Sequence, residues 1–310
     1  MKSDPSSRAP FALDTVDIRL LRLFLRVAEA GGLSAAQGEL NLSLSTISER
    51  IGALEERLGV TLCKRGRGGF SLTEAGRQVL EEAQKLMGSL DDFSRRIAGL
   101  RSDLSGSLTI GLVDNIISDP RLPLSAVFAS LAEKAPALQL TLDVRPPGEL
   151  LRELATGRLD LAIGSFPRAP LGFGYVDLHD EVHNFHCGAG HPLFAADDAG
   201  IDVERVRGHR IIGRSYWAAR DLRLFALTTP HAIVSNMEAE AQLILSGAYL
   251  GYLPDHYARP FIAAGRMRVL RPNLFSYRAR FQIAGPEDWR DRPLTRTFID
   301  LLQAAVRAGG

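Results

Sequence analysis

The sequence predicts an α/β protein of two domains, in which an all-helical N-terminal module is joined by one long helix to a larger C-terminal α/β domain. Three observations support this fold class. Residues 17–58 carry apolar side chains at helical spacing in short segments, residues 73–101 carry one uninterrupted apolar stripe, and from Leu108 onward short β-type runs alternate with helical ones. A chain of 310 residues is long enough for two domains with separate cores.

The composition is that of a folded protein with balanced charge. Apolar residues make up 45%, charged residues 24%, and the net charge is +1. Nucleic-acid binding therefore requires a local basic patch. Residues 1–13 lack an apolar run and no later run reaches the roughly 18 residues of a membrane span, so we expect a disordered tail and a cytoplasmic protein without a membrane partner. Cys63 and Cys187 fall in different predicted domains, which excludes a disulfide framework.

The N-terminal module begins with three short predicted helices. The first runs from Asp17, its predicted N-cap, to Gly31-Gly32. Residues Ser34 to Gln37 have the form of a capping box and start a second helix, which ends near Leu40. The third ends at Gly59 and carries apolar residues at steps of four, three and four: Ile47, Ile51, Leu54 and Leu58. Three short helices joined by tight turns predict a helix-turn-helix.

The polar face of the third predicted helix carries residue types suited to the major groove. Small hydroxyls allow close approach to base edges, Glu49 can accept from a cytosine amino group, and Arg50 can reach a phosphate or guanine. The alternative is a solvated helix face. Residues 64–70 favour DNA, because they place three cations on a Gly-rich turn of a predicted hairpin, suited to phosphate contact. We therefore predict double-stranded DNA as a partner of Ser34, Ser43, Ser45, Thr46, Ser48, Glu49, Arg50, Lys64, Arg65 and Arg67.

This region resembles the signature of LysR-type transcriptional regulators. The resemblance is carried by Leu33 to Ala36, Ser43 to Ser48, Arg50-Ile51, residues 54–60, Leu62, Arg65, Leu72-Thr73 and Ala75-Gly76. It implies a winged helix-turn-helix (residues 14–72), a linker helix and a periplasmic-binding-protein-like (type 2) effector domain, in a homodimer or homotetramer that works with RNA polymerase. The chain departs from the family pattern at Leu44, usually glutamine, at Glu49, often basic or polar, and at Cys63, often phenylalanine, so its DNA sequence preference stays open.

Residues 73–101 predict one long helix with a narrow apolar stripe. From its predicted N-cap Thr73 it would extend on the order of 40 Å, with charged residues flanking the stripe. Such a stripe is typical of a coiled coil, and the alternative is packing against its own domain. Because a dimer can bind two DNA half-sites, we predict a dimer interface of Val79, Ala83, Leu86, Leu90, Phe93 and Ile97.

After a predicted hinge at residues 102–107, residues 108–310 predict a domain of parallel sheets with helices on both faces. Strands are predicted at 108–112, 138–144, 159–163, 210–213, 232–235, 250–253 and 281–283, and helices at 124–134, 149–155 and 238–246. The family resemblance continues at residues 157–163, 191–193 and 247–254. It implies two lobes with a small-molecule effector between them: lobe I of residues 108–165 and 271–310, and lobe II of residues 166–270. The chain is expected to cross near Ser165 and near Leu270.

Ligands of such folds bind beyond the carboxyl ends of strands, which predicts a polar and aromatic effector site at the loops of residues 113–118, 164–167, 214–217, 236–237 and 252–254. Helix N-termini there favour anions, whereas Asp114 would oppose an anion and could hold an amine. The alternative is that Asp114 caps a helix or turn. The predicted effector-binding residues are Asp114, Asn115, Ile116, Ser165, Phe166, Ser215, Tyr216, Asn236 and Tyr252.

The sequence indicates neither an enzyme nor a metal site. Gly-x-Ser-x-Gly, the phosphate-binding loop and Gly-x-Gly-x-x-Gly motifs are all missing, since Gly188-Ala189-Gly190 lacks the third glycine. A group of His179, His183, His186, Cys187 and His191 resembles a ligand set, but His183 and His186 would point to opposite faces of an extended segment. With one cysteine in the sensing domain, a two-thiol redox sensor is disfavoured. We therefore predict no cofactor and no metal, and the remaining rival class is a small-molecule binding protein without DNA function.

Overall fold

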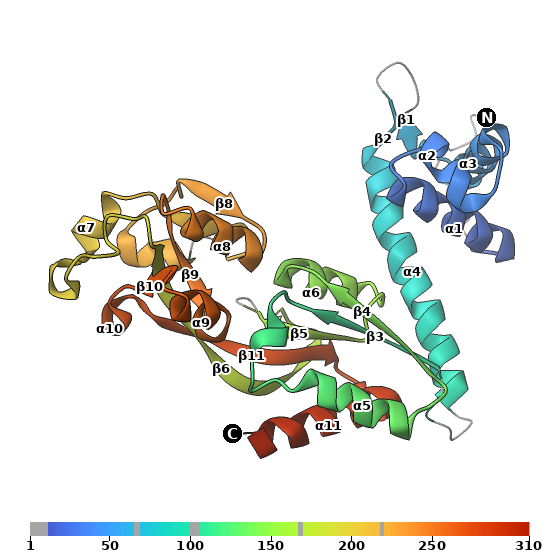
Figure 1. Cartoon of the computed structure of the whole chain (residues 1–310). Helices are drawn as coiled ribbons and strands as arrows, with labels where there is room; N and C mark the ends of the chain where they lie inside the picture. Colours follow the sequence, from blue (N-terminus) through green and yellow to red (C-terminus); the bar gives the residue numbers. More distant parts are fainter. Residues whose placement is uncertain are drawn as a thin grey trace, which may run out of the picture. The chain divides into compact units, whose positions relative to one another are not determined.

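The computed structural model describes residues 12–64, 69–99, 104, 106–166, 170–217 and 220–309. The chain divides into two compact units, a first unit up to Phe93 and a second unit from Ser94 onward. The first contains α1 to α3, the hairpin β1–β2 and most of α4, and the second contains all further elements (Figure 1).

The first unit contains the predicted helix-turn-helix. Its helices are α1 (Thr15–Glu29), α2 (Leu33–Leu40) and α3 (Leu44–Leu58). α3 begins after Ser43, whose Oγ accepts from the Thr46 N–H at 3.2 Å, and ends at Gly59, which has a left-handed φ of 69°. One face of α3 is fully buried in the core of this unit, through Ile47, Ile51 and Leu54.

Two predicted helix starts are wrong. α1 begins after Asp14 and not at Asp17: the Asp14 carboxylate accepts from the Val16 and Asp17 N–H groups, and Asp17 accepts from the Asp14 N–H at 2.9 Å to complete a capping box. α2 begins after Gly32 without a side-chain cap, so Ser34 does not start it. Gly32 has φ 149°, and Phe70 Cβ lies 3.1 Å from where a Cβ on Gly32 would be, so tertiary packing fixes this turn.

A hairpin and a long helix complete the first unit. β1 (Cys63–Lys64) pairs antiparallel with β2 (Ser71–Leu72), as predicted, whereas Arg65 and Arg67 lie outside the described residues. α4 (Glu74–Gly99) begins after Thr73, whose Oγ1 accepts from the Gly76 N–H at 2.8 Å and confirms the predicted cap. A Cβ on Gly76 would lie 1.9 Å from the Leu62 carbonyl oxygen, so glycine allows the chain before the hairpin to lie against α4.

The second unit is built on a seven-stranded mixed sheet of order β10-β6-β11-β5-β3-β4, with β9 also paired to β6. β3 (Gly106–Leu112) is parallel to β4 (Leu138–Val144) and β5 (Leu161–Ser165). β6 (Phe173–Gly188) runs antiparallel to β11 (Tyr277–Pro286), β9 (Leu250–Pro254) and β10 (Met267–Val269). The prediction of parallel sheets therefore holds for β3, β4 and β5 and is wrong for the strands that pair with β6. The predicted hinge is also too long, because β3 includes Gly106 and Ser107.

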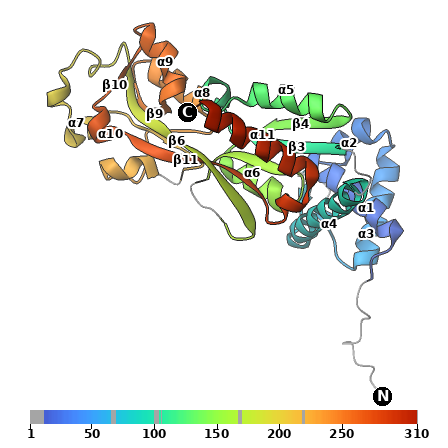
Figure 2. The same cartoon turned by 90° about the horizontal axis from the view of Figure 1, so that it is seen from below.

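The lobes are joined by two long strands. β6 and β11 pair from Phe173–Pro286 to His183–Tyr277, and Figure 2 shows them running together from one lobe into the other. Phe166 packs in a cluster of lobe I, and Phe275 in the core of lobe II. The crossings therefore lie within β6 and β11 and not, as predicted, near Ser165 and Leu270. Lobe I therefore extends beyond residue 165 and lobe II beyond residue 270, because β6 and β11 run through both lobes.

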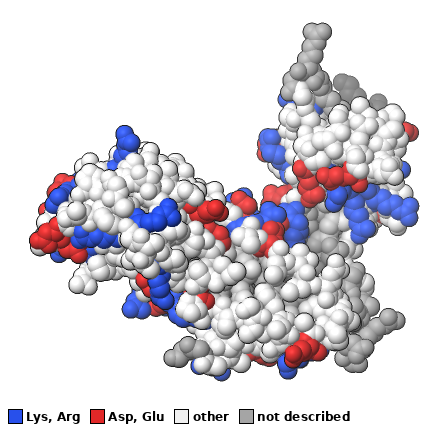
Figure 3. Space-filling view, in the orientation of Figure 1, with Lys and Arg blue, Asp and Glu red and all other residues white. Residues whose placement is uncertain are grey.

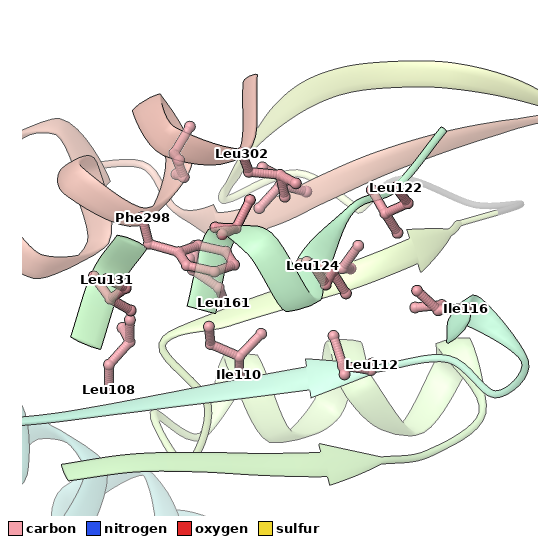
Figure 4. Close-up of a cluster of buried hydrophobic side chains, with 14 of the residues drawn as sticks. Leu108, Ile110, Leu112, Ile116, Leu122, Leu124, Leu131, Leu161, Phe298 and Leu302 are labelled. Atoms are coloured by element: carbon pink, nitrogen blue, oxygen red, sulfur yellow. The ribbon is translucent and has the colours of Figure 1, made fainter. Parts of the chain in front are cut away.

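Lobe I is covered by helices on both faces of its sheet. α5 (Leu124–Lys134) and α11 (Pro293–Gly309) cover one face and α6 (Pro147–Ala155) the other (Figure 1). On the first face Ile110, Leu124 and Phe298 pack together with leucines of the same cluster (Figure 4). Successive side chains of β5 point to opposite faces of the sheet, so they pack in turn under α5 and α11 on one face and under α6 on the other.

Lobe II is built around an aromatic core of Phe185, Phe225, Tyr252 and Phe275. Its further elements are α7 (Val203–Arg207), β7 (Ile212–Arg214), β8 (Ala232–Val234), α8 (Met237–Leu245), α9 (Asp255–Ala263) and α10 (Pro272–Phe275). Short 3-10 turns are η1 (Ile116–Ser118), η2 (Asp198–Gly200), η3 (Arg220–Phe225) and η4 (Trp289–Asp291). Within the described ranges, no helix combines the length and apolar character that a membrane crossing requires.

Candidate functional site

The first candidate site is the exposed face of α3, opposite its buried stripe. Ser45, Glu49 and Arg50 are exposed, and Thr46 and Ser48 are half-buried. Three hydroxyls gather at the first turn, because Ser43 Oγ lies 2.9 Å from Ser45 Oγ and 2.8 Å from Thr46 Oγ1. The positive end of the helix dipole lies at the same turn, so this end of α3 suits a phosphate or an acceptor on a base edge.

The other described residues of the predicted DNA site lie outside α3. Ser34 is exposed on α2, and Lys64 is exposed on β1 of the hairpin. Across the face shown in Figure 3, basic and acidic side chains are interspersed, in keeping with the net charge of +1.

An ion pair holds α3 against α1. Asp17 is fully buried and accepts from Arg57 Nη2 at 3.0 Å and from Arg57 Nε. Arg57 also contacts Asp14 at 2.6 Å. The hydrogen bond from Arg57 is the main reason that the pKa of Asp17 lies below its usual value. Asp14, Asp17 and Arg57 therefore position α3, a role that the sequence analysis did not assign to them.

Glu55 connects α3 to the hairpin. Its Oε1 accepts from the Leu62 N–H at 2.7 Å and from the Cys63 N–H at 3.2 Å. Glu55 was part of the family signature, but its spacing alone gave no role. The structure shows that one α3 side chain fixes the residues where β1 begins, and so fixes α3 and the hairpin relative to each other.

The predicted dimer stripe on α4 divides into two parts. Ala83 is buried, and Val79 and Leu86 pack with it into the core of the first unit. Packing against its own domain, the alternative for this helix, therefore holds for these three residues. Phe93, in contrast, is 63% exposed. Leu90 is half-buried, and the side chain of Ile97 lies outside the described residues.

The second candidate site is the cleft between the lobes of the second unit. It encloses a cavity of about 30 Å³, enough for one or two water molecules. Three predicted effector residues line it: Asp114, Ser165 and Tyr216. Five other lining residues lie in the loops that the sequence indicated: Val113, Arg214, Trp217, Met237 and Pro254. Five lie outside those loops: Pro147, Glu181, His183, His256 and Phe281.

The remaining predicted effector residues do not line this cavity. Ile116 and Phe166 are buried in lobe I and Tyr252 in the aromatic core of lobe II. Asn236 is the N-cap of α8, with Oδ1 accepting from the Ala239 N–H at 2.8 Å. Ser215 lines a neighbouring pocket.

Asp114 and its neighbour Asn115 connect the two lobes. Asp114 Oδ2 accepts from the Met237 N–H, the first residue of α8, at 2.5 Å and from Asn115 Nδ2 at 2.8 Å. Burial raises the pKa of Asp114, and the hydrogen bond from Met237 opposes this rise. Asp114 therefore caps a helix across the cleft, the alternative that the sequence left open, while it also lines the cavity.

A chain of buried polar groups forms one wall of the cleft. Glu181 Oε1 accepts from His256 Nε2 at 2.9 Å, and Glu181 Oε2 accepts from His183 Nε2 at 2.6 Å. His256 Nδ1 is hydrogen-bonded to Ser118 Oγ at 2.8 Å. Burial alone would raise the pKa of Glu181, but the two histidine hydrogen bonds lower it to about 2. Glu181 is thus a buried carboxylate held ionised by its partners.

Arg214 extends this chain into lobe II. It is buried, and its Nε lies 3.0 Å from Asp221 Oδ2 and 3.8 Å from Glu240 Oε2. Arg214 also donates to Tyr277 Oη and to His183 Nδ1. Burial raises the pKa of Glu240 to about 8, although Arg214 opposes the rise. Arg214 therefore forms an ion pair with Asp221, and a second buried acid, Glu240, lies beside the same guanidinium.

A metal is not needed to explain the buried acids. Asp119, Glu181 and His256 bring three possible ligand atoms within 4.8 Å of one another. Each already has protein partners, because Asp119 accepts from Arg121 and from His179 at 2.8 Å, and Glu181 and His256 bond each other. Of the other histidines, His186 is buried with both ring nitrogens unpaired among the described residues.

Comparison with known proteins covers both units. A family model described as a bacterial regulatory helix-turn-helix protein of the lysR family matches residues 18–77. A second, described as the LysR substrate binding domain, matches residues 101–307. The chain is 35% identical over 286 residues to the HTH-type transcriptional activator BauR of Pseudomonas aeruginosa, covering 92% of this chain and 93% of the relative. It is 24% identical over 293 residues to the HTH-type transcriptional regulator CbbR of Xanthobacter flavus, covering 92% and 87%.

Two solved structures share the fold. Full-length CbnR in complex with its target DNA matches with a TM-score of 0.60 and 20% identity, covering 93% of this chain and 99% of that one. A full-length OxyR variant from Pseudomonas aeruginosa matches with a TM-score of 0.60 and 22% identity, covering 96% and 95%. At these identities, the likeness shows the arrangement of helices and strands only.

Proposed function

Since the chain belongs to the LysR family of bacterial transcriptional regulators, we propose that α3 enters the DNA major groove and that a small molecule bound between the lobes controls the outcome. Proteins of this family are DNA-binding regulators with an effector-binding domain and not enzymes. The observation that carries the proposal is the division of α3 into a fully buried apolar face and an exposed polar face.

In this proposal the first turn of α3 makes the base contacts. Ser45 and Thr46 are held by hydrogen bonds to Ser43, so their hydroxyls are already placed when DNA arrives. Lys64, on the hairpin, contacts a phosphate, which adds affinity without sequence preference. The complex of CbnR with DNA shows that a chain of this fold binds its target DNA.

The test is equilibrium binding of the full chain to its own upstream DNA at several salt concentrations. Lys64→Ala is expected to weaken binding to all DNA alike and to reduce the salt slope by about 1, because one phosphate contact is lost. Lys134→Ala, at the end of α5 in the second unit, is the control and leaves the slope unchanged. If the wild type shows no preference for this DNA over random DNA at low salt, a binding protein without DNA function replaces this proposal.

We also propose a homodimer, or a tetramer built from such dimers, through the second half of the α4 stripe. Support comes from Phe93, a large apolar side chain that the first unit leaves 63% exposed. Two copies would present two recognition helices to two half-sites. Phe93→Glu is expected to shift the protein toward the monomer in sedimentation experiments. Arg95→Glu, a change of the same chain segment outside the predicted stripe, is the control, and equal association of both variants would argue against this interface.

The effector is proposed to bind in the cleft, where charged groups of both lobes meet. A ligand there can change the relative population of open and closed lobes, because the chain passes from lobe to lobe in β6 and β11. Ser165→Val is expected to weaken the transcriptional response to the effector without changing DNA binding in its absence. An amine-containing effector stays a prediction, and an unchanged ligand affinity in Asp114→Asn would contradict it.

The remaining partners follow from the regulator role. We propose that the protein acts in the cytoplasm, where bacterial DNA lies, and that it contacts RNA polymerase at the promoter. A transcription assay with purified polymerase tests the second point, since a direct contact predicts that polymerase and regulator bind the promoter cooperatively.

A further inference from the structure

A large apolar side chain is exposed at the start of α3. Leu44 is the first residue of this helix, and it is 43% exposed. Leu40 and Leu42, shortly before it in the chain, are partly buried against the core of the first unit, and the apolar stripe of α3 is fully buried in that core. Leucine is among the residues most often buried, so the exposure of Leu44 at this place needs a reason.

Leu44 lies among the residues that are proposed to contact DNA. It directly precedes Ser45, and it comes four residues before Ser48, so the side chains of Leu44 and Ser48 lie on one side of α3. Long side chains on a helix point toward its N-terminus, so Leu44 extends past the first turn. That turn contains no acid, and the first carboxylate along α3 belongs to Glu49. This end of the helix therefore combines an apolar group with hydroxyls and has no negative charge that would repel DNA.

The hydroxyl cluster beside Leu44 has a proton left for an acceptor outside the cluster. Ser43 Oγ has two lone pairs and one proton. One lone pair accepts from the Thr46 N–H at 3.2 Å, so only one of the Ser45 and Thr46 hydroxyls can also donate to Ser43. The other hydroxyl accepts from Ser43, and its own proton has no acceptor within the cluster. The first turn of α3 thus offers a hydroxyl donor next to an apolar side chain.

Thymine is the base whose major-groove edge matches these two groups. Its edge carries the O4 acceptor next to the C5 methyl group, whereas cytosine presents an amino donor and no methyl group. The edges of adenine and guanine carry no methyl group either. An apolar side chain that contacts the methyl group therefore selects thymine, and a hydroxyl can donate to O4 of the same base.

We propose that Leu44 is a specificity-determining residue that contacts the C5 methyl group of one thymine in each DNA half-site. This role rests on the proposed function, because it requires that α3 enters the major groove. It also explains the departure from the family pattern at this position. Glutamine, the usual residue, pairs with adenine through its amide and has no apolar end for a methyl group. With leucine in its place, the preferred DNA site of this chain carries thymine at the base that Leu44 contacts.

The experiment measures equilibrium binding of the full chain to its own upstream DNA, after footprinting has located the protected bases. Each protected thymine is replaced in turn by deoxyuridine, which lacks only the C5 methyl group and keeps O4 and the pairing with adenine. At one thymine per half-site, the wild type is expected to bind about fourfold more weakly, since burial of one methyl group contributes about that factor. Leu44→Gln is expected to bind the thymine and uracil DNAs equally. Leu44→Met keeps an apolar end and should retain the difference.

Two control variants separate the methyl contact from other effects. Val16→Gln is the matched control, because Val16 is an apolar residue of the same unit that is 49% exposed at the start of α1. It should keep both the wild-type affinity and the wild-type difference between the two DNAs. Ser45→Ala should weaken binding but keep the difference, because uracil retains O4. Thermal unfolding checks that Leu44→Gln is folded.

Two results would overturn the role of Leu44: no thymine whose methyl group matters to the wild type, or a Leu44→Gln variant that still distinguishes the two DNAs. The uracil scan of the wild type needs no variant, so the first result is decisive even if a substitution disturbs folding. A failure of the proposed function gives a different result. The wild type would then show no preference for its upstream DNA over random DNA, and the role of Leu44 would be refuted with it.

Discussion

The two units position their functional side chains in different ways. In the first unit, the residues that face DNA in our proposal follow one another along α3 and are exposed or half-buried. In the second unit, the cleft wall is made by Asp114, Glu181, Arg214 and His256, which are far apart in sequence and mostly buried. Helical geometry alone positions the first set, whereas the second set requires the whole sheet. Substitutions of these residues should therefore change DNA recognition in the first unit and the stability of the fold in the second.

The largest difference in stability loss between the two units is expected when the arginines that pair with buried acids are replaced. Arg214→Met leaves Asp221 and Glu240 buried without their cation, and we expect a loss of about 3 to 5 kcal/mol of unfolding free energy. Arg57→Met in the first unit should cost less, because the Arg57 side chain is 38% exposed and water can replace part of its contact. Urea denaturation of both variants measures this difference, and equal losses would contradict the comparison.

Gly76→Ala should be the most damaging small change in the first unit. The added Cβ would lie 1.9 Å from the Leu62 carbonyl oxygen, so the chain before β1 must move away from α4. We expect a loss of about 3 kcal/mol, as for overpacked sites, with weakened DNA binding. Gly38→Ala in α2 is the control, since nothing lies within 4 Å of its Cβ position. That variant should be as stable as the wild type or more so, and a similar loss in both would refute the packing argument.

Acid should destabilise the second unit through His186. Burial lowers the pKa of His186 to about 4, so the unfolded state binds a proton that the folded state excludes. The free energy of unfolding therefore has its full value above the usual histidine pKa of about 6.5, and it decreases as the pH falls towards 4. At pH 5 this group accounts for a loss of about 2 kcal/mol. His186→Leu should lack that part of the loss between pH 7.5 and pH 5, and an unchanged pH dependence of unfolding would show that His186 is not its source.

The smallest expected effect is the difference in stability between two serine variants, one at Ser43, the N-cap of α3, and one at Ser45 in its first turn. Ser43→Ala removes the N-cap and should cost about 1 kcal/mol of stability. Ser45→Ala should leave stability nearly unchanged, because the Ser45 side chain is exposed and caps nothing. Thermal unfolding compares the two variants. A larger stability loss in Ser45→Ala than in Ser43→Ala would mean that the hydroxyl cluster is structural.

The same contrast explains what the sequence could predict. The turns of the first unit follow from local rules, so α3, its end at Gly59 and the hairpin were predicted. The start of α2 was missed because it depends on Phe70, which is far from Gly32 in sequence and packs against it. Rules based on neighbouring residues therefore do not predict the start of a helix in the first unit when a tertiary contact takes the place of a side-chain cap.

In the second unit, β6 was not predicted at all. Its second half is buried on both faces and its first half is half-exposed, so it lacks the alternation by which strands are recognised. Without β6, Glu181 and His183 could not be assigned to the cleft. Arg214 lies in a predicted loop, but its ion pairing was not predicted, since arginine is normally exposed and here lies buried beside two acids. The loops after β3, β5 and β7 were predicted and supplied Asp114, Ser165 and Tyr216, and the predicted loops at the ends of β8 and β9 supplied Met237 and Pro254.

The most direct test of the account is the ratio of affinities for upstream DNA and random DNA, measured for the full chain at one fixed salt concentration. The account predicts a ratio well above one for the wild type, a lower ratio for Ser45→Ala, and an unchanged ratio for Lys64→Ala despite weaker binding overall. A wild-type ratio of one, or a ratio that Ser45→Ala leaves unchanged while Lys64→Ala lowers it, would contradict the claim that α3 recognises the DNA sequence.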